Sequence, residues 1–176
     1  MTIRLIGLNH RYQLRGYAGA DWSAFERYLL SYSANKGVDL LAEELSDEAV
    51  RKWKAEDSVA RHVARCLGVR HLFCDPESGQ REALGIRSFG DILAELGPRP
   101  TVDLVEATER EDWRVREQHW LNTLRNVSFT TCVFILGSQH VESFETLLLS
   151  ERCDAAIVEK NWDPNHGIQP TAFGRG

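Results

Sequence analysis

Two histidines occur in nearly matching contexts about 130 residues apart. The segments are IRLIGLNH at residues 3–10 and VFILGSQH at residues 133–140. In each, an apolar run ends in Gly, and a His follows three residues later, directly after an Asn or a Gln. A glycine at a strand end lets the backbone turn sharply or approach a ligand closely. We therefore expect His10 and His140 to reach back over two strand ends, where an imidazole can bind a metal or move a proton.

The Gly-x-x-His motif alone is weak evidence for a functional site. A third copy, GVRH at residues 68–71, precedes its apolar run instead of following it, and Arg70 stands where the amide would be. The alternative for either of the other copies is an ordinary glycine-containing turn followed by an exposed or capping histidine. Their shared position after a strand-like run favours the functional interpretation.

Acidic residues also follow strand-like runs. Glu43 and Glu44 end the run at 38–44, and Asp75 follows the run at 69–74. Successive residues of a strand point to opposite faces, so only one of the two glutamates is expected to enter a given site, and the spacing does not say which. The alternatives are that the glutamates stabilise the start of the next helix and that Asp75, before a proline, is a turn residue.

An arginine lies on the apolar face of a long expected helix. Arg116 comes three residues after Trp113 and four residues before Trp120, so helical spacing places all three on one face. A buried guanidinium usually needs an acidic partner. Arg116 is therefore expected either to point at the carboxylates or a substrate, or to pack its stem while its guanidinium reaches water.

These residues need elements that bring them to one place, and the chain alternates strand-like with helix-like stretches. The expected strands are residues 2–8, 38–44, 69–74, 128–137 and 154–160. The expected helices are residues 21–37, 46–68, about 88–96, 101 to about 126, and 140–153. This alternation predicts a single α/β domain over residues 1–160, with a mainly parallel sheet of about five strands, helices on both faces and a tail at 161–176. Ligands bind beyond the carboxyl ends of the strands in such sheets.

The overall composition excludes some classes of protein. The net charge of −5 gives no basic field for nucleic-acid phosphates, so no nucleic-acid partner is expected. No apolar run approaches the roughly 20 residues that cross a bilayer, and the first residues do not resemble a signal peptide. The four cysteines form no CxxC pair, which favours reduced thiols. We expect a cytoplasmic protein without a membrane partner; its oligomeric state is left open.

The order of these motifs resembles that of the TIKI/TraB superfamily, which also takes in ChaN-like and erythromycin-esterase-like proteins. The resemblance rests on Gly7-x-x-His10, Glu43-Glu44, Arg116-Glu117 with Trp120-Leu121, and Gly137-x-x-His140. It implies an α/β domain with the paired motifs and a glutamate at one pocket. Some members of the superfamily are metal-dependent peptidases, and others act as esterases or bind haem. The resemblance therefore implies cleavage of an amide or ester bond in a small molecule or peptide.

Two hydrolytic mechanisms and one non-catalytic role are consistent with these residues. In the first, His10, His140 and Glu43 or Glu44 hold a divalent ion (Zn, Mn, Fe or Co), the other glutamate is the general base and Arg116 stabilises the oxyanion. In the second, a histidine is the base without a metal and a glutamate fixes its tautomer. The third is a domain that binds a small anionic ligand without catalysis. The sequence has no Gly-x-Ser-x-Gly elbow, P-loop or Gly-x-Gly-x-x-Gly motif, which disfavours a serine hydrolase and familiar nucleotide binding.

Overall fold

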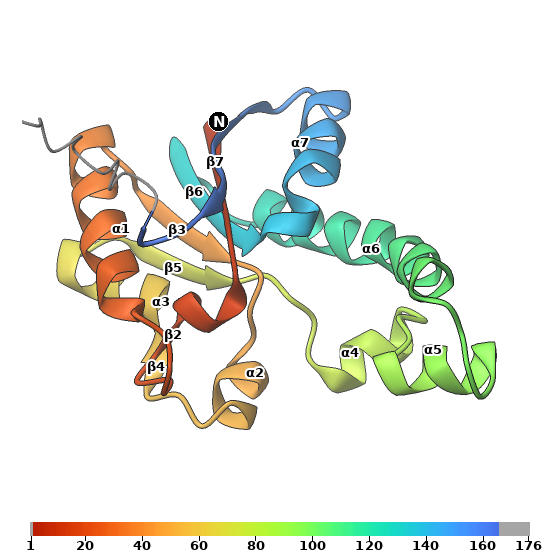
Figure 1. Ribbon diagram of the computed structural model, residues 1–176. Helices are drawn as coiled ribbons and strands as arrows, with labels where there is room; N and C mark the ends of the chain where they lie inside the picture. Colours follow the sequence, from red (N-terminus) through yellow and green to blue (C-terminus); the bar gives the residue numbers. More distant parts are fainter. Residues whose placement is uncertain (1, 166–176) are drawn as a thin grey trace, which may run out of the picture.

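A computed structural model describes residues 2–165 and has one parallel sheet of five strands, in the order β5-β3-β6-β1-β7 (Figure 1). The strands are β1 (Thr2–Leu8), β3 (Leu40–Glu43), β5 (Arg70–Phe73), β6 (Thr131–Gly137) and β7 (Asp154–Trp162). The two-residue strands β2 (Leu14–Arg15) and β4 (Asp57–Ser58) pair antiparallel outside this sheet. The predicted α/β class and parallel sheet are confirmed.

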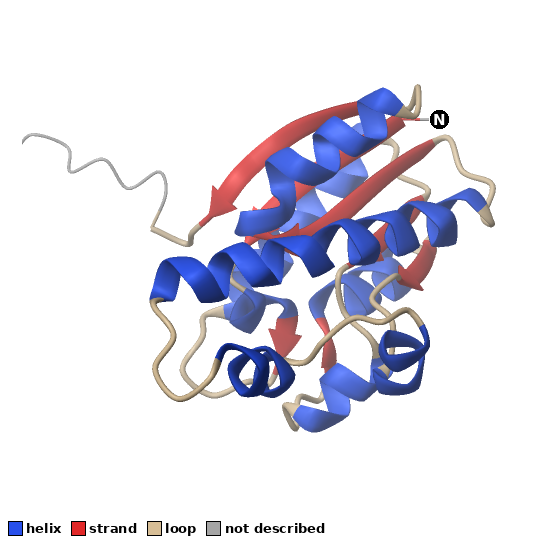
Figure 2. Cartoon of the chain, turned by 90° about the vertical axis from the view of Figure 1, so that its right-hand side faces the viewer, coloured by secondary structure: helices blue, strands red, loops and turns tan. Residues whose placement is uncertain are grey.

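Helices cover both faces of the sheet, as the alternation predicts. They are α1 (Trp22–Lys36), α2 (Asp47–Lys52), α3 (Val59–Leu67), α4 (Ser78–Ala83), α5 (Phe89–Leu96), α6 (Val102–Arg125) and α7 (Val141–Ser150). Along β3, Leu40 and Ala42 belong to a core shared with α6 and α7, the face that Figure 2 turns toward the viewer. Leu41 belongs to a second core shared with α1 and α3 on the other face. This alternation is what a strand buried on both sides requires.

The predicted helix at 46–68 is wrong as a single element. It is two helices, α2 and α3, separated by a connection in which Lys54 has a φ of 52° and Asp57 and Ser58 form β4. The Ser58 side chain then accepts a hydrogen bond from the Arg61 backbone and so begins α3. A left-handed residue followed by an N-cap ends one helix and starts another, although the sequence in between contains good helix-forming residues.

Other boundaries differ less. The short helix α4 was not predicted, whereas α5 and α6 lie where helices are expected. Strand β7 continues to Trp162, two residues into the predicted tail, and residues 166–176 of that tail lie outside the described residues. Among the described residues, no helix is long and apolar enough to cross a membrane.

The pairing of β1 with β6 places the two Gly-x-x-His motifs side by side. Gly7 pairs with Leu136, and Leu8 pairs with Gly137. Each strand runs into a short 3₁₀ turn, η1 (His10–Gln13) after β1 and η2 (Ser138–His140) after β6. Because the strands are parallel, both histidines leave the sheet at its carboxyl edge.

Candidate active site around Glu44

Glu44 lies at the centre of the polar residues at this edge. Its side chain is buried, directly after β3. Arg116 Nη2 donates to Glu44 Oε1 at 2.7 Å, and the backbone N–H of Gly137 donates to Glu44 Oε2 at 2.8 Å. Each carboxylate oxygen therefore has a donor, one from α6 and the other from the end of β6.

Both histidines of the matched motifs face Glu44 Oε1. The Nε2 atom of His10 lies 3.8 Å from this oxygen, and the Nε2 atom of His140 lies 3.6 Å from it. The His10 side chain is 41% exposed, whereas the His140 side chain is fully buried. The cluster thus has one imidazole that a ligand can reach from solvent and one that is enclosed.

His140 is held from its other side by a glutamate. Its Nδ1 lies 2.9 Å from Glu117 Oε1, and Ser143 Oγ donates to the same oxygen at 2.6 Å. Because a carboxylate only accepts hydrogen bonds, we assign the His140 proton to Nδ1. The ring also packs against Trp113 and Trp120, at centroid distances of 4.6 and 5.1 Å. Its buried Nε2 has no hydrogen-bond partner among the described residues.

Arg116 connects Glu44 to Asp75. Its Nε and Nη2 donate to Asp75 Oδ1 at 3.1 and 2.8 Å, and Trp120 Nε1 donates to the same oxygen at 3.2 Å. Arg81 binds the other oxygen of Asp75. The arginine therefore points at carboxylates, the first of the two roles expected for it, and Asp75 is more than a turn residue.

Opposing effects set the charge of Glu44. Burial raises the pKa of this carboxyl, but the positive charge of Arg116, followed by His10 and His140 and the Gly137 N–H, outweighs burial and lowers the pKa to about 2. Burial likewise opposes the charge of Arg116, yet Glu44 and Asp75 raise the pKa of its guanidinium. Glu44 is consequently a fixed negative charge at neutral pH.

Close packing explains the glycines of both motifs. A Cβ at position 137 would stand 2.9 Å from His10 Nε2 and 3.4 Å from Glu44 Oε2. A Cβ at position 7 would overlap the backbone oxygen of Lys160 and a methyl group of Val141. Neither glycine has a positive φ, so the sharp turn considered for them is not the reason for the residue type. The missing side chain at Gly137 makes room for His10 and Glu44. The missing side chain at Gly7 lets β1 pack closely against β7 and α7.

Glu43 does not join this cluster. Its Oε1 faces His71 Nε2 at 2.6 Å and accepts from Ser58 Oγ, on the face of the sheet that α1 and α3 cover. Strand alternation therefore directs Glu44 to the site and Glu43 away from it. The third Gly-x-x-His copy has a different structure, because Gly68 caps the end of α3 with a φ of 67° and His71 lies within β5.

Glu117 is the main residue that the strand-end pattern does not identify, because it lies in the middle of α6. Its distance in sequence from two tryptophans nonetheless indicates that it is buried. It lies four residues after Trp113 and three residues before Trp120, on the same buried face, and its exposed fraction is only 2%. A glutamate at such a position needs a partner, and His140 is that partner.

The residues expected to bind a metal ion are only partly brought together, because His10 and His140 face Glu44 whereas Glu43 does not. Within residues 2–165, no group of three or more His, Cys, Asp or Glu side chains is arranged so that it could hold a metal ion. Glu43, one of the expected ligands, lies on the other face. Arg116 already occupies the oxygen of Glu44 that faces both histidines.

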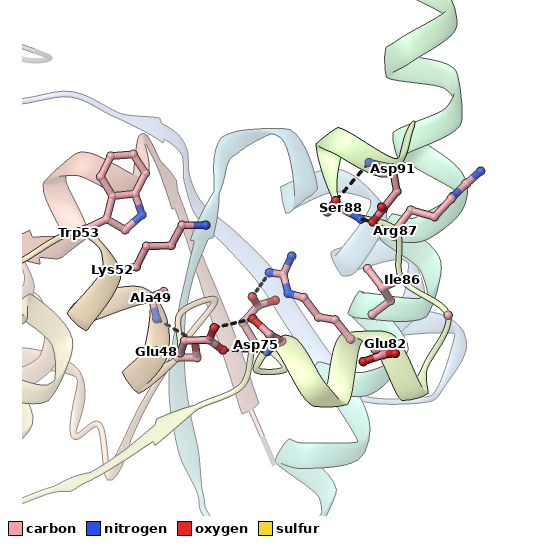
Figure 3. A pocket seen from close by; sticks show the side chains of 14 residues that line it. Glu48, Ala49, Lys52, Trp53, Asp75, Glu82, Ile86, Arg87, Ser88 and Asp91 are labelled. Atoms are coloured by element: carbon pink, nitrogen blue, oxygen red, sulfur yellow. Dashed lines mark hydrogen bonds and ion pairs between the residues drawn. The ribbon is translucent and has the colours of Figure 1, made fainter. Parts of the chain in front are cut away.

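Two clefts open beside the cluster. A pocket of about 340 Å³ contains His10 together with Leu14, Tyr17 and Trp53. A larger cleft of about 760 Å³ contains Asp75 (Figure 3). In Figure 3, Lys52 and Trp53 lie on one side of this cleft and Ile86 and Arg87 lie on the other. Trp53 lines both clefts.

No protein-family model matches the chain, and neither a curated protein nor a solved structure gives a significant match. The resemblance to the TIKI/TraB superfamily stays a prediction that rests on the residue pattern. The geometry around Glu44 supports a functional proposal independently of that resemblance.

Proposed function

We propose that this protein is a hydrolase that cleaves an ester or amide bond in a small molecule or peptide, with His140, His10 and Glu44 as its reacting centre. The observation that carries this proposal is the state of His140. Its Nδ1 is held by Glu117, and its Nε2 is buried without a described partner, 3.6 Å from a carboxylate oxygen. A buried polar atom without a partner costs about 1–3 kcal/mol and calls for an explanation, and a catalytic role is one such explanation.

In the proposed reaction, His140 is the general base. The Nδ1–H of His140 donates a hydrogen bond to Glu117, and this leaves the Nε2 lone pair free to take a proton from a water molecule bound next to Glu44. The resulting hydroxide attacks the carbonyl carbon of the substrate. Glu117 stabilises the positive charge that the imidazole gains.

His10 is assigned to the leaving group. It is the exposed imidazole of the pair and lines the pocket through which a substrate arrives. When the carbon–oxygen or carbon–nitrogen bond breaks, His10 donates a proton to the departing atom and His140 holds the proton taken from water. Transfer of that proton to His10 through water restores both residues.

Glu44 acts by its charge. A carboxyl with a pKa of about 2 is a weak base at neutral pH, so it is unsuited to abstract a proton from water. Its oxygen instead lies near both imidazole Nε2 atoms and stabilises either as a cation. Arg116 and Gly137 hold Glu44 in place, and with its Nε and Nη2 bound to carboxylates we assign Arg116 to this positioning role.

The metal-dependent mechanism is a separate prediction that the test must address. If the reaction depended on a divalent ion, His10 and His140 would be two of its ligands. Glu44 would be the carboxylate ligand in place of Glu43. The metal-free mechanism needs only side chains of this protein. It is supported by Arg116, which binds the Glu44 oxygen that faces both histidines.

Hydrolysis of a panel of nitrophenyl esters and nitroanilides by the purified protein tests the proposal, with a chelator or with added Zn²⁺, Mn²⁺, Fe²⁺ or Co²⁺. We expect turnover that persists in the chelator and is lost in folded His10→Asn and His140→Asn variants. Turnover that needs a stoichiometric metal would replace this mechanism with the metal-dependent one. Absence of turnover across the panel, together with ligand binding at the site, would favour the non-catalytic role.

A further inference from the structure

The pocket that contains His10 has an unusual wall. Its six lining residues are Asn9, His10, Arg11, Leu14, Tyr17 and Trp53. Three of them are apolar or aromatic, and they come from two separate parts of the chain, the segment after β1 and the end of α2. The exposed imidazole therefore stands beside a largely apolar space of about 340 Å³.

Trp53 is fixed in place although it is half exposed. The exposed fraction of Trp53 is 52%, which is high for a tryptophan. The Tyr17 ring packs against it edge to face, with the centroids 5.6 Å apart. Its backbone caps α2, and the left-handed Lys54 follows it. The indole is thus an exposed aromatic surface held by its neighbours.

Arg11 also lines this pocket. The guanidinium of Arg11 stacks on the Tyr12 ring at 4.9 Å and donates to the Tyr12 hydroxyl at 3.1 Å. Arg11 makes no ion pair within the described residues 2–165. The lining therefore includes two aromatic residues, one histidine and one arginine.

We propose that this pocket binds a flat aromatic group of the substrate, attached to the carbonyl whose bond is cleaved beside His10, and that Trp53 and Tyr17 determine this preference. The inference rests on the proposed hydrolase function for the cleavage step only. A volume near 340 Å³ is at the small end of ligand pockets, so it suits one ring and its linker. The rest of a larger substrate can pass Trp53 into the cleft of Figure 3, which the same indole lines.

Binding of uncleaved probes tests this preference apart from catalysis. N-methyl-2-phenylacetamide and N-methylacetamide are titrated into the folded His10→Asn and His140→Asn proteins, which are expected not to cleave them, with affinity measured by NMR chemical shifts. We expect the phenyl probe to bind at least tenfold more tightly in both proteins, because an aromatic contact and its buried area add to the affinity. Equal affinity of the two probes would overturn the inference.

Variants of the wall identify the residue responsible. Trp53→Ala is expected to weaken binding of the phenyl probe about tenfold, and Trp53→Phe is expected to retain most of the affinity. Phe89→Ala, which removes an exposed aromatic ring of α5, is the control and should leave the affinity unchanged. An unchanged affinity in folded Trp53→Ala would refute the role of Trp53. Tight binding of the phenyl probe without hydrolysis of any ester would refute the proposed function and leave the aromatic preference supported.

Discussion

The imidazole of His10 lies against Gly137, so that a Cβ at position 137 would stand 2.9 Å from Nε2. Gly137 also donates its N–H to Glu44 at 2.8 Å. The glycine of the second motif thus makes room for the histidine of the first motif and holds the carboxylate between the two histidines. The repeated pattern is therefore one site made by two strand ends.

Gly137→Ala should disturb this site more than the fold. The added methyl must displace the His10 ring, whose side chain can move because it is partly exposed. We expect the rate of ester hydrolysis to fall at least tenfold, with an unfolding free energy within about 1–2 kcal/mol of the wild type. Kinetics and urea unfolding measure the two effects. Gly90→Ala is the control, since its Cβ would meet nothing closer than 3.6 Å, and equal activity in both variants would contradict the packing account.

Arg116→Met should destabilise the protein at neutral pH. The change leaves the buried carboxylate of Glu44 without its cation and removes one partner of Asp75, a loss of about 3–5 kcal/mol for a buried ion pair. Urea unfolding at pH 7 measures this loss. Arg114→Met, at an exposed position of the same helix, should stay within about 0.5 kcal/mol of the wild type. A similar small effect for Arg116→Met would mean that the cluster does not need its arginine.

The charge of Glu44 should make stability depend on acid pH. Its folded pKa of about 2 lies below its ordinary value of 4.5, so the folded state binds fewer protons than the unfolded state. The contribution is complete above about pH 4.5 and is lost as the pH falls toward 2, on the order of 3 kcal/mol in all. Unfolding free energies between pH 5 and pH 3 should fall more steeply in the wild type than in Glu44→Gln. Parallel curves would show that Glu44 has an ordinary pKa.

Glu117→Gln should lower kcat about 100-fold and leave KM nearly unchanged, because an uncharged amide no longer stabilises the His140 cation. Glu43→Gln provides the contrast, since its side chain lies on the other face with His71. Its kcat should stay within about twofold of the wild type. If Glu43→Gln lost as much activity as Glu117→Gln, the assignment of the two faces would be wrong.

Much of the fold follows from local sequence patterns. Apolar runs ended by polar or glycine residues identify all five strands of the main sheet, and the helix expected over residues 21–37 matches α1, which Asp21 and Gly37 cap. The break between α2 and α3 could not be predicted in this way, because it depends on the left-handed Lys54 and on pairing with β2, a distant segment. Tertiary contacts override helix propensity there.

The site could be predicted in part for the same reason. The rule that ligands meet the carboxyl ends of parallel strands places His10, His140, Glu44 and Asp75 at one edge. The choice between Glu43 and Glu44 depends on the phase of β3 relative to the two cores, which spacing does not give. Glu117 is in mid-helix, outside the rule, and its role depends on how α6 lies across the sheet.

The central claim is that His10 and His140 share Glu44 as one centre, and NMR of the imidazole nitrogens measures this most directly. Ring ¹⁵N and ¹H shifts of histidine-labelled protein are compared between the wild type and folded Glu44→Gln. We predict that the signals of both His10 and His140 shift, while those of His62 on α3 stay in place. A change at only one of the two histidines, or at neither, would contradict the account.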